Sequence, residues 1–215
     1  MDKLSNRYLV SLLRKQLPDT NFINKLKILY RPYVCPFKEI LQLIPPESCL
    51  MDIGCGSGMF LMLVAELCQP KKIAGIEISE ELVKNARYLI SCYPIQSQIE
   101  KYDGSSIPDF IAEYNMITMI DVFHHIPTFQ QETFIEQLFS KMSKGSQLLF
   151  KDIDASAFPW IYFNKIHDFI FAGEIGKEWT FQKTIDFFQK IGFKLKKTTR
   201  MRTFVYPHFL LWLEK

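Results

Sequence analysis

Three glycines within five positions, Gly54, Gly56 and Gly58, follow a short apolar run and precede a helix-like stretch. Glycine adopts positive φ angles without steric cost and lets the backbone approach a ligand closely. The first turn of a helix presents unpaired N–H groups and a partial positive charge to whatever lies before it. A glycine loop between a strand and a helix therefore predicts a site for a carboxylate or a phosphate. A tight turn that holds no ligand is the alternative interpretation.

Acidic residues stand close to this loop or after the neighbouring apolar runs. Glu77 ends the next run, where a carboxylate can accept hydrogen bonds from both hydroxyls of a ribose. Asp103, in YDGSS, could accept a hydrogen bond from an adenine amino group, and Asp52 could hold an ammonium group beside the loop. These features predict a site for a nucleoside with a small charged tail. A solvated acid at Glu77 and an ordinary Asp-Gly turn at Asp103 remain open alternatives.

The spacing of the glycines helps to choose between two nucleoside cofactors. A dinucleotide favours G-x-G-x-x-G, and GCGSG at 54–58 is one residue shorter. The chain resembles the class I S-adenosylmethionine-dependent methyltransferase family, in its small-molecule branch. The similar motifs are LMDIGCGSG (50–58), IEIS (76–79), YDGSS (102–106), IDVFHHI (120–126) and LLFKDID (148–154).

This resemblance implies S-adenosylmethionine as the cofactor and a fold of the α/β class. The family has a Rossmann-like, seven-stranded, mostly parallel sheet with helices on both faces and an antiparallel C-terminal strand. The cofactor-binding residues implied by the matching motifs are Asp52, Gly54, Cys55, Gly56, Glu77, Ile78, Asp103, Gly104, Asp121 and Val122.

Methyl transfer from a sulfonium is an in-line displacement, so the protein mainly has to align the reactants in a dry site. A base is needed only if the attacking atom carries a proton near neutral pH. The candidates at the ends of the fourth and fifth strands and in a later aromatic stretch are His124, His125, Asp152 and His167. A buried structural role is the alternative for each histidine.

The acceptor is a small molecule or a lipid-like compound, and its reacting atom (O, N, S or C) is not predicted. DVFH at 121–124 stands where methyltransferases acting on nucleic-acid amines carry N/D-P-P-Y/F, so no nucleic-acid substrate is expected. Eight aromatic residues between 158 and 181 favour a helical lid over an apolar acceptor. Two other functions stay open: an NAD(P)-dependent oxidoreductase, and a non-catalytic protein that keeps the cofactor fold.

Strands and helices alternate in the order that these motifs require. Strands are predicted at 49–53, 72–78, 97–103, 114–122 and 146–153, with two more strand-like runs at the C-terminus. Helices are predicted at 4–17, from 22 to before Pro32, at 37–44, 58–68, from 80, at 128–142 and at 180–191. We divide the chain into an N-terminal helical cap (1–46) and a methyltransferase domain (47–215) with a lid-like insertion at about 155–179.

Composition sets the remaining expectations. The 215 residues are 48% apolar and carry a net charge of +3, which does not favour a general nucleic-acid binder. Five cysteines without a CxxC pair, no apolar run long enough to span a membrane and no signal peptide predict a cytoplasmic protein without a metal site. Residues 1–36 and 189–215 each hold seven Lys or Arg. Two interpretations stay open for them: ordinary solvated faces, or peripheral contact with an anionic lipid surface or substrate. The oligomeric state is not predicted.

Overall fold

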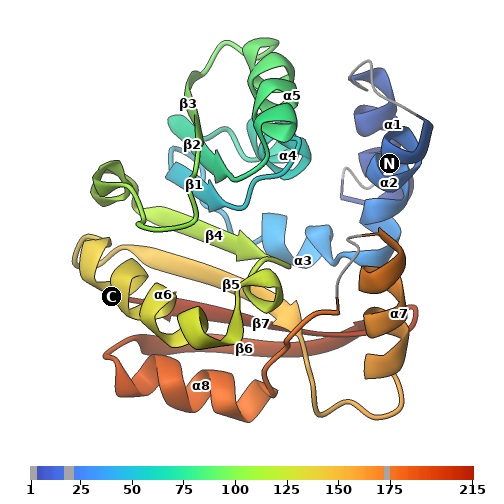
Figure 1. Cartoon of the computed structure of the whole chain (residues 1–215). Helices are drawn as coiled ribbons and strands as arrows, with labels where there is room; N and C mark the ends of the chain where they lie inside the picture. Colours follow the sequence, from blue (N-terminus) through green and yellow to red (C-terminus); the bar gives the residue numbers. More distant parts are fainter. Residues whose placement is uncertain (1–3, 17–21, 172–174) are drawn as a thin grey trace. The chain divides into compact units, whose positions relative to one another are not determined.

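The computed structural model describes residues 4–16, 22–171 and 175–215 (Figure 1). The strands are β1 (Cys49–Ile53), β2 (Lys72–Glu77), β3 (Gln96–Lys101), β4 (Met116–Ile120), β5 (Gln147–Ile153), β6 (Lys194–Thr203) and β7 (Tyr206–Glu214). The α-helices are α1 (Asn6–Lys15), α2 (Phe22–Val34), α3 (Phe37–Leu41), α4 (Met59–Leu67), α5 (Glu80–Ser91), α6 (Thr128–Lys141), α7 (Ile161–Phe171) and α8 (Phe181–Lys190). Short 3₁₀ helices are η1 (Asp109–Glu113) and η2 (Phe123–His125).

The seven strands follow the order β3-β2-β1-β4-β5-β7-β6. β1 pairs in parallel with β2, β2 with β3, and β4 with β5. The last strand, β7, runs antiparallel to both β5 and β6. The predicted fold class, a mostly parallel seven-stranded α/β sheet with an antiparallel C-terminal strand, is therefore confirmed.

The chain divides into two compact units, Met1–Ser105 and Ser106–Lys215, which we describe separately. In the first unit Leu50 and Met51 of β1 are fully buried, as expected for a strand covered on both faces. α4 is buried along Leu61–Val64, and α5 turns Val83, Ala86 and Leu89 inward. These two helices place the loop after β1 and the loop after β2 at fixed points.

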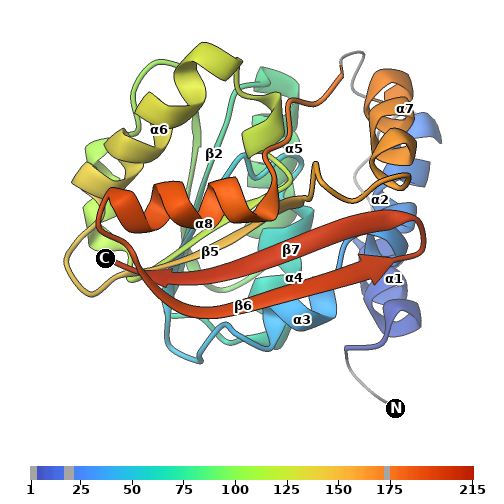
Figure 2. The same ribbon diagram turned by 90° about the horizontal axis from the view of Figure 1, so that it is seen from below.

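In the second unit a cluster of rings joins the sheet to its helices. The ring of Phe150 on β5 lies 5.5 Å from Phe123, 5.0 Å from Phe188 on α8 and 6.0 Å from Phe209 on β7, measured between centroids. Figure 2 shows α6 and α8 side by side on one face of this part of the sheet. The buried rings hold the ends of β4 and β5, from which the candidate catalytic residues project.

Some element bounds differ from the sequence prediction. α2 continues through Pro32 to Val34, although a helix ending before Pro32 was predicted. A proline inside a helix removes one hydrogen bond, but here Pro32 is buried together with Ile28 and Val34, and this packing outweighs the loss. β4 is also shorter than the predicted 114–122, because Asp121 leaves the strand with a φ of 54°.

None of the helices in the described ranges is long and apolar enough to cross a membrane. The proposed division at residue 46 and the lid-like role of 155–179 stay predictions. The insertion itself is helical at α7.

Candidate functional site

The glycine loop after β1 is held against β2 by backbone hydrogen bonds. The amides of Gly54 and Cys55 both donate to the carbonyl of Ile76, at 2.8 and 3.1 Å. Gly58, with a φ of 81°, precedes α4, and a Cβ atom there would lie 2.9 Å from the Cα and Cβ of Ala86 on α5. This third glycine is therefore required for helix packing.

Gly56 has a different environment. Its φ is 55°, and a Cβ atom at this position would meet nothing within 4 Å. The backbone of the loop thus faces open space at its centre, where a ligand can approach it closely. This is the feature that a glycine loop needs in order to bind a ligand through its amides.

Glu77 is buried, and its carboxylate is tied to the loop. Oε2 accepts a hydrogen bond from the amide of Gly56 at 3.0 Å, and Oε1 accepts one from the amide of Ser79 at 2.9 Å. A carboxylate has about four acceptor positions, so two hydrogen-bond donors do not exhaust it. Sequence reasoning placed Glu77 near the loop but did not predict this direct bond to Gly56.

Asp52 on β1 and Cys55 in the loop are both buried. Burial, and after it the negative charges of Asp52 and Glu77, raise the pKa of the Cys55 thiol far above its usual range. A Cβ atom at Gly75 on β2 would lie 2.7 Å from the Cys55 sulfur, so this side chain packs against β2. Cys55 is therefore a neutral, buried thiol that packs against β2, and its amide holds the loop to Ile76.

The segment after β3 is joined to Glu77 by its main chain, since the amide of Tyr102 donates to the Glu77 carbonyl at 2.8 Å. The two carboxylate oxygens of Asp103 accept from the amide and the hydroxyl of Ser105, at 2.8 and 2.7 Å. This is the local turn that was weighed as an alternative, and a contact with adenine stays a prediction. Gly104 has open space around it, and Ile78 is exposed beside Glu77.

In the second unit, Asp121 follows β4 in a left-handed conformation that is uncommon for residues other than glycine. Its amide donates to the carbonyl of Lys151 at 3.0 Å, and its carboxylate pairs with the ammonium group of the same lysine, which is fully buried. Backbone strain of this kind persists where the surroundings enforce it, and it is common at functional sites. Val122, half-buried, continues the turn.

His124 and Asp152 form a buried pair. Nδ1 of His124 contacts Oδ1 of Asp152, which also accepts from the amide of Ile153 at 2.8 Å. The ring of His125, which is half-buried, lies 4.2 Å from that of His124. The structure thus brings together three of the four predicted catalytic residues, which sequence reasoning had listed separately. The side chain of the fourth, His167, lies outside the described residues.

Gln131 on α6 was missed, although it links the region around His124 to the insertion. Its amide nitrogen donates to the carbonyls of Phe123 and Lys177, at 3.2 and 3.0 Å, and its oxygen accepts from the Trp179 indole at 2.6 Å. Lys177 in turn donates its amide to the His124 carbonyl at 2.9 Å. A sequence signal exists, because Gln131 occupies a position of the buried stripe of α6 that continues at 134, 135 and 138.

Asp154 was also not assigned a role. Oδ1 accepts from the amide and hydroxyl of Ser156 and from the amide of Phe181, and Oδ2 accepts from Arg200 at 2.8 Å. Burial alone would raise the pKa of Asp154, but these hydrogen bonds and the Arg200 charge outweigh it and hold the pKa below its usual value. Asp154 thus joins the beginning of the insertion to its end and to β6.

Comparison with known families matches residues 29–198 to a family described as a methyltransferase domain. The chain belongs to this family. Its members include the class I S-adenosylmethionine-dependent methyltransferases predicted from the motifs. At the level of the family, the predicted cofactor S-adenosylmethionine and the predicted enzyme class are confirmed.

Two curated proteins share part of this methyltransferase domain. Carboxy-S-adenosyl-L-methionine synthase of Campylobacter fetus is 24% identical over 131 residues, which are 56% of this chain and 53% of that protein. The mitochondrial ubiquinone biosynthesis O-methyltransferase of Saccharomyces cerevisiae is 21% identical over 105 residues, 49% of this chain and 33% of that protein. The matched region therefore spans about half and a third of these relatives.

Among solved structures, the magnesium protoporphyrin IX methyltransferase of Synechocystis PCC 6803 with bound SAH has a TM-score of 0.68. It is 19% identical, and the similarity covers 95% of this chain and 93% of that one. At this identity the likeness supports the fold of the methyltransferase domain.

Proposed function

We propose that this protein transfers a methyl group from S-adenosylmethionine to a small-molecule or lipid-like acceptor. The observation that carries the proposal is the bond between Glu77 and the amide of Gly56, on a loop whose centre is open. When bound, S-adenosylmethionine supplies an activated methyl group on a sulfonium. The chain itself has to bind the cofactor, orient the acceptor, exclude water and, for a protonated nucleophile, remove a proton.

In the first unit the residues match two polar parts of the cofactor, its ribose and its charged methionyl tail. The free acceptor positions of Glu77 fit the ribose hydroxyls, and the exposed side chain of Ile78 offers an apolar surface to adenine. Asp52 would hold the ammonium group of the charged methionyl tail. The fit rests on the open space at Gly56, which a side chain would fill.

In the second unit, Asp152 orients His124, and His124 would accept the proton of an acceptor hydroxyl or amine. His125, whose ring lies 4.2 Å from that of His124, would contact the acceptor. Asp121 and Val122 keep the cofactor-binding role that the fourth-strand motif implies.

The acceptor class is supported by composition and by the relatives. The insertion at 155–179 is rich in aromatic side chains, which favour an apolar compound. One relative is named for ubiquinone biosynthesis and one structural neighbour for magnesium protoporphyrin IX, and both names imply large, partly apolar acceptors. We therefore propose an aryl or lipid-like acceptor. A cytoplasmic location stays our prediction, supported by five free cysteines.

Calorimetry with S-adenosylmethionine and, separately, NAD(P) tests the cofactor. We expect micromolar binding of the former and none of the latter, whereas the reverse would favour the oxidoreductase. A labelled-methyl assay across aryl, lipid-like and water-soluble acceptors then tests catalysis. Cofactor binding without transfer to any acceptor would favour the non-catalytic alternative.

Asp152→Asn tests the proposed base. It keeps the size of the side chain but removes its charge, so we expect a fall in kcat of about 100-fold with little change in cofactor affinity. The matched control is Asp186→Asn on α8, an exposed acid. Unchanged kcat in Asp152→Asn and in His125→Asn would remove these residues from the reaction without affecting the assignment of the cofactor.

A further inference from the structure

Helix α7 is oriented with its apolar side outward. Ile161 and Asn164 are buried, and the Asn164 amide donates to Glu178 at 2.9 Å. At 100° per residue these two positions lie on one side of the helix. The exposed residues of the opposite side are almost all apolar: Tyr162, Phe163, Ile166, Phe169 and Ile170. A helix on the surface of a soluble domain ordinarily has the reverse arrangement.

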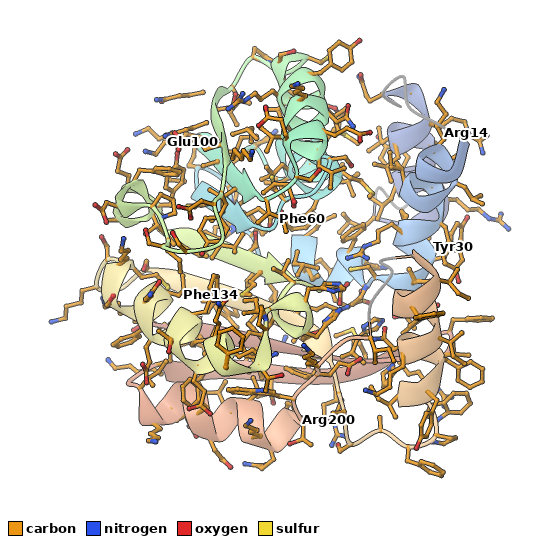
Figure 3. All side chains as sticks on the ribbon, in the orientation of Figure 1. Arg14, Tyr30, Phe60, Glu100, Phe134 and Arg200 are labelled. Atoms are coloured by element: carbon orange, nitrogen blue, oxygen red, sulfur yellow. The ribbon has the colours of Figure 1, made fainter. Side chains whose placement is uncertain are left out.

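The exposed residues form one continuous sector. Positions 169, 162, 166, 170 and 163 fall within about 120° around the helix. Figure 3 shows side chains projecting from α7 on the side away from the sheet. Phe158, just before the helix, is also exposed and lies 6.0 Å from Tyr162, ring to ring. An apolar patch of this extent usually marks a binding surface.

The β6–β7 hairpin ends beside α7 in both Figure 1 and Figure 2. Arg202 on β6 lies over the Trp160 ring at 4.5 Å, which joins the hairpin to the start of the helix. At the turn, Phe204 is 77% exposed and has a φ of 57°. A bulky aromatic residue is uncommon at such a φ, and here it places an exposed ring at the tip of the hairpin.

The charge of the hairpin distinguishes between possible partners. β6 carries five basic residues and no acid. Arg200 and Arg202 lie in the half of the strand next to the turn, where the exposed Arg200 also pairs with Asp154, whereas Lys194, Lys196 and Lys197 lie in the far half. α7 contributes Lys165 and Asp168, so the helix adds no net charge. A second copy of this chain would bring the same basic strand to the interface, and the like charges would repel. A surface of anionic lipid headgroups attracts them.

We propose that the outward face of α7 and the tip of the β6–β7 hairpin bind an anionic lipid bilayer. Aromatic and aliphatic side chains enter the boundary between headgroups and acyl chains, while Arg200 and Arg202, next to the turn, meet the lipid phosphates. The surface consists of Phe158, Tyr162, Ile166, Phe169, Ile170 and Phe204 with Arg200 and Arg202, and we call it the α7 face. The proposed role of the α7 face in binding a bilayer does not depend on the identity of the methyl acceptor.

The test is co-sedimentation of the full chain with vesicles of phosphatidylcholine alone or mixed with phosphatidylglycerol. We expect binding to the mixed vesicles, weakened by salt, and at least about tenfold weaker binding to phosphatidylcholine. Ile166→Ser combined with Phe169→Ser should reduce binding about tenfold or more, because both side chains would lose their burial in lipid. The matched control is Phe129→Ser, which removes an exposed ring of α6 outside the α7 face.

Several results would overturn the proposal. One is no binding to either vesicle, and another is equal loss of binding in the control. If size-exclusion chromatography without lipid showed a dimer that the double variant abolished, the α7 face would belong to a second copy. A fall in the melting temperature of the double variant with unchanged vesicle binding would assign the face to packing within the chain.

Discussion

The two units hold their candidate functional residues through different kinds of contact. In the first unit the contacts are made mainly by backbone groups. The amides of Gly54 and Cys55 donate to the carbonyl of Ile76, and the amide of Gly56 donates to the carboxylate of Glu77. In the second, the contacts join side chains about 30 residues apart, His124 with Asp152 and Lys151 with Asp121. A backbone turn can be recognised from a local sequence motif. A pair of side chains from two separate motifs, such as IDVFHHI and LLFKDID, cannot be recognised as a pair from either motif.

The largest effect is expected at the packing glycine. Gly58→Ala should lower the free energy of unfolding by about 3 kcal/mol, because the new Cβ would both strain a left-handed residue and collide with Ala86. Gly145→Ala is the matched control, since Gly145 has the same φ of 81° but open space around it. Its cost should be about 1 kcal/mol. Urea denaturation measures both, and equal losses would contradict a packing role for Gly58.

Glu77→Gln should weaken the binding of S-adenosylmethionine by about 30-fold, because an amide accepts fewer hydrogen bonds than a carboxylate and carries no charge. Calorimetry gives the affinity, and a melting curve shows whether the loop has lost stability through its bond to Gly56. Glu81→Gln, an exposed acid in the first turn of α5, is the control. Undiminished binding by Glu77→Gln would contradict the placement of the ribose.

Asp154→Asn should destabilise the protein by about 2 kcal/mol at neutral pH, through the loss of charge-assisted hydrogen bonds. The pKa of Asp154 is lowered in the folded chain, so its contribution is complete above the unfolded value of 3.8 and is lost as the pH falls through the folded value. The difference between the wild type and the variant should therefore shrink below pH 4. Denaturation across this pH range measures it, with Asp186→Asn as the exposed control. A difference that stays constant down to pH 2 would exclude the ionised carboxylate as its cause.

The smallest effect concerns Cys55. Because its pKa is raised and its side chain is buried, a thiol reagent at pH 8 should leave it unmodified while the exposed Cys92 reacts within minutes. Mass spectrometry of tryptic peptides distinguishes the two cysteines. Rapid modification of Cys55 in the folded protein would show that the loop opens readily.

The fold was largely predictable from the sequence. The bounds of β1 agree with the prediction to the residue, and those of β2 to within one residue, because each is a short apolar run bounded by glycine or polar residues. The end of α2 was wrong, since proline propensity is a local signal and burial of Pro32 is a tertiary one. The same limit applies to β4, whose apolar pattern continues past the point where Asp121 changes direction.

The contacts among the candidate functional residues were likewise predictable only in part. Proximity of Glu77 to the glycine loop was predictable, because consecutive parallel strands present their carboxyl ends at one edge. The pairing of His124 with Asp152 was not, since it depends on the register of β4 against β5 and on a side-chain rotamer. Gln131 and Asp154 were missed for a related reason: each has partners far away in the sequence, Lys177 and Trp179 for Gln131 and Phe181 and Arg200 for Asp154, and no local motif marks these pairs.

One consequence follows from the base of the insertion. The amide of Ala155 donates to the Trp179 carbonyl at 3.2 Å, and Asp154 bridges Ser156 and Phe181, so the two ends of the insertion meet in a closed neck between β5 and α8. The neck fixes where the chain leaves β5 and where α8 begins. The intervening stretch can be lengthened, shortened or exchanged during evolution without disturbing the register of β5 with β7.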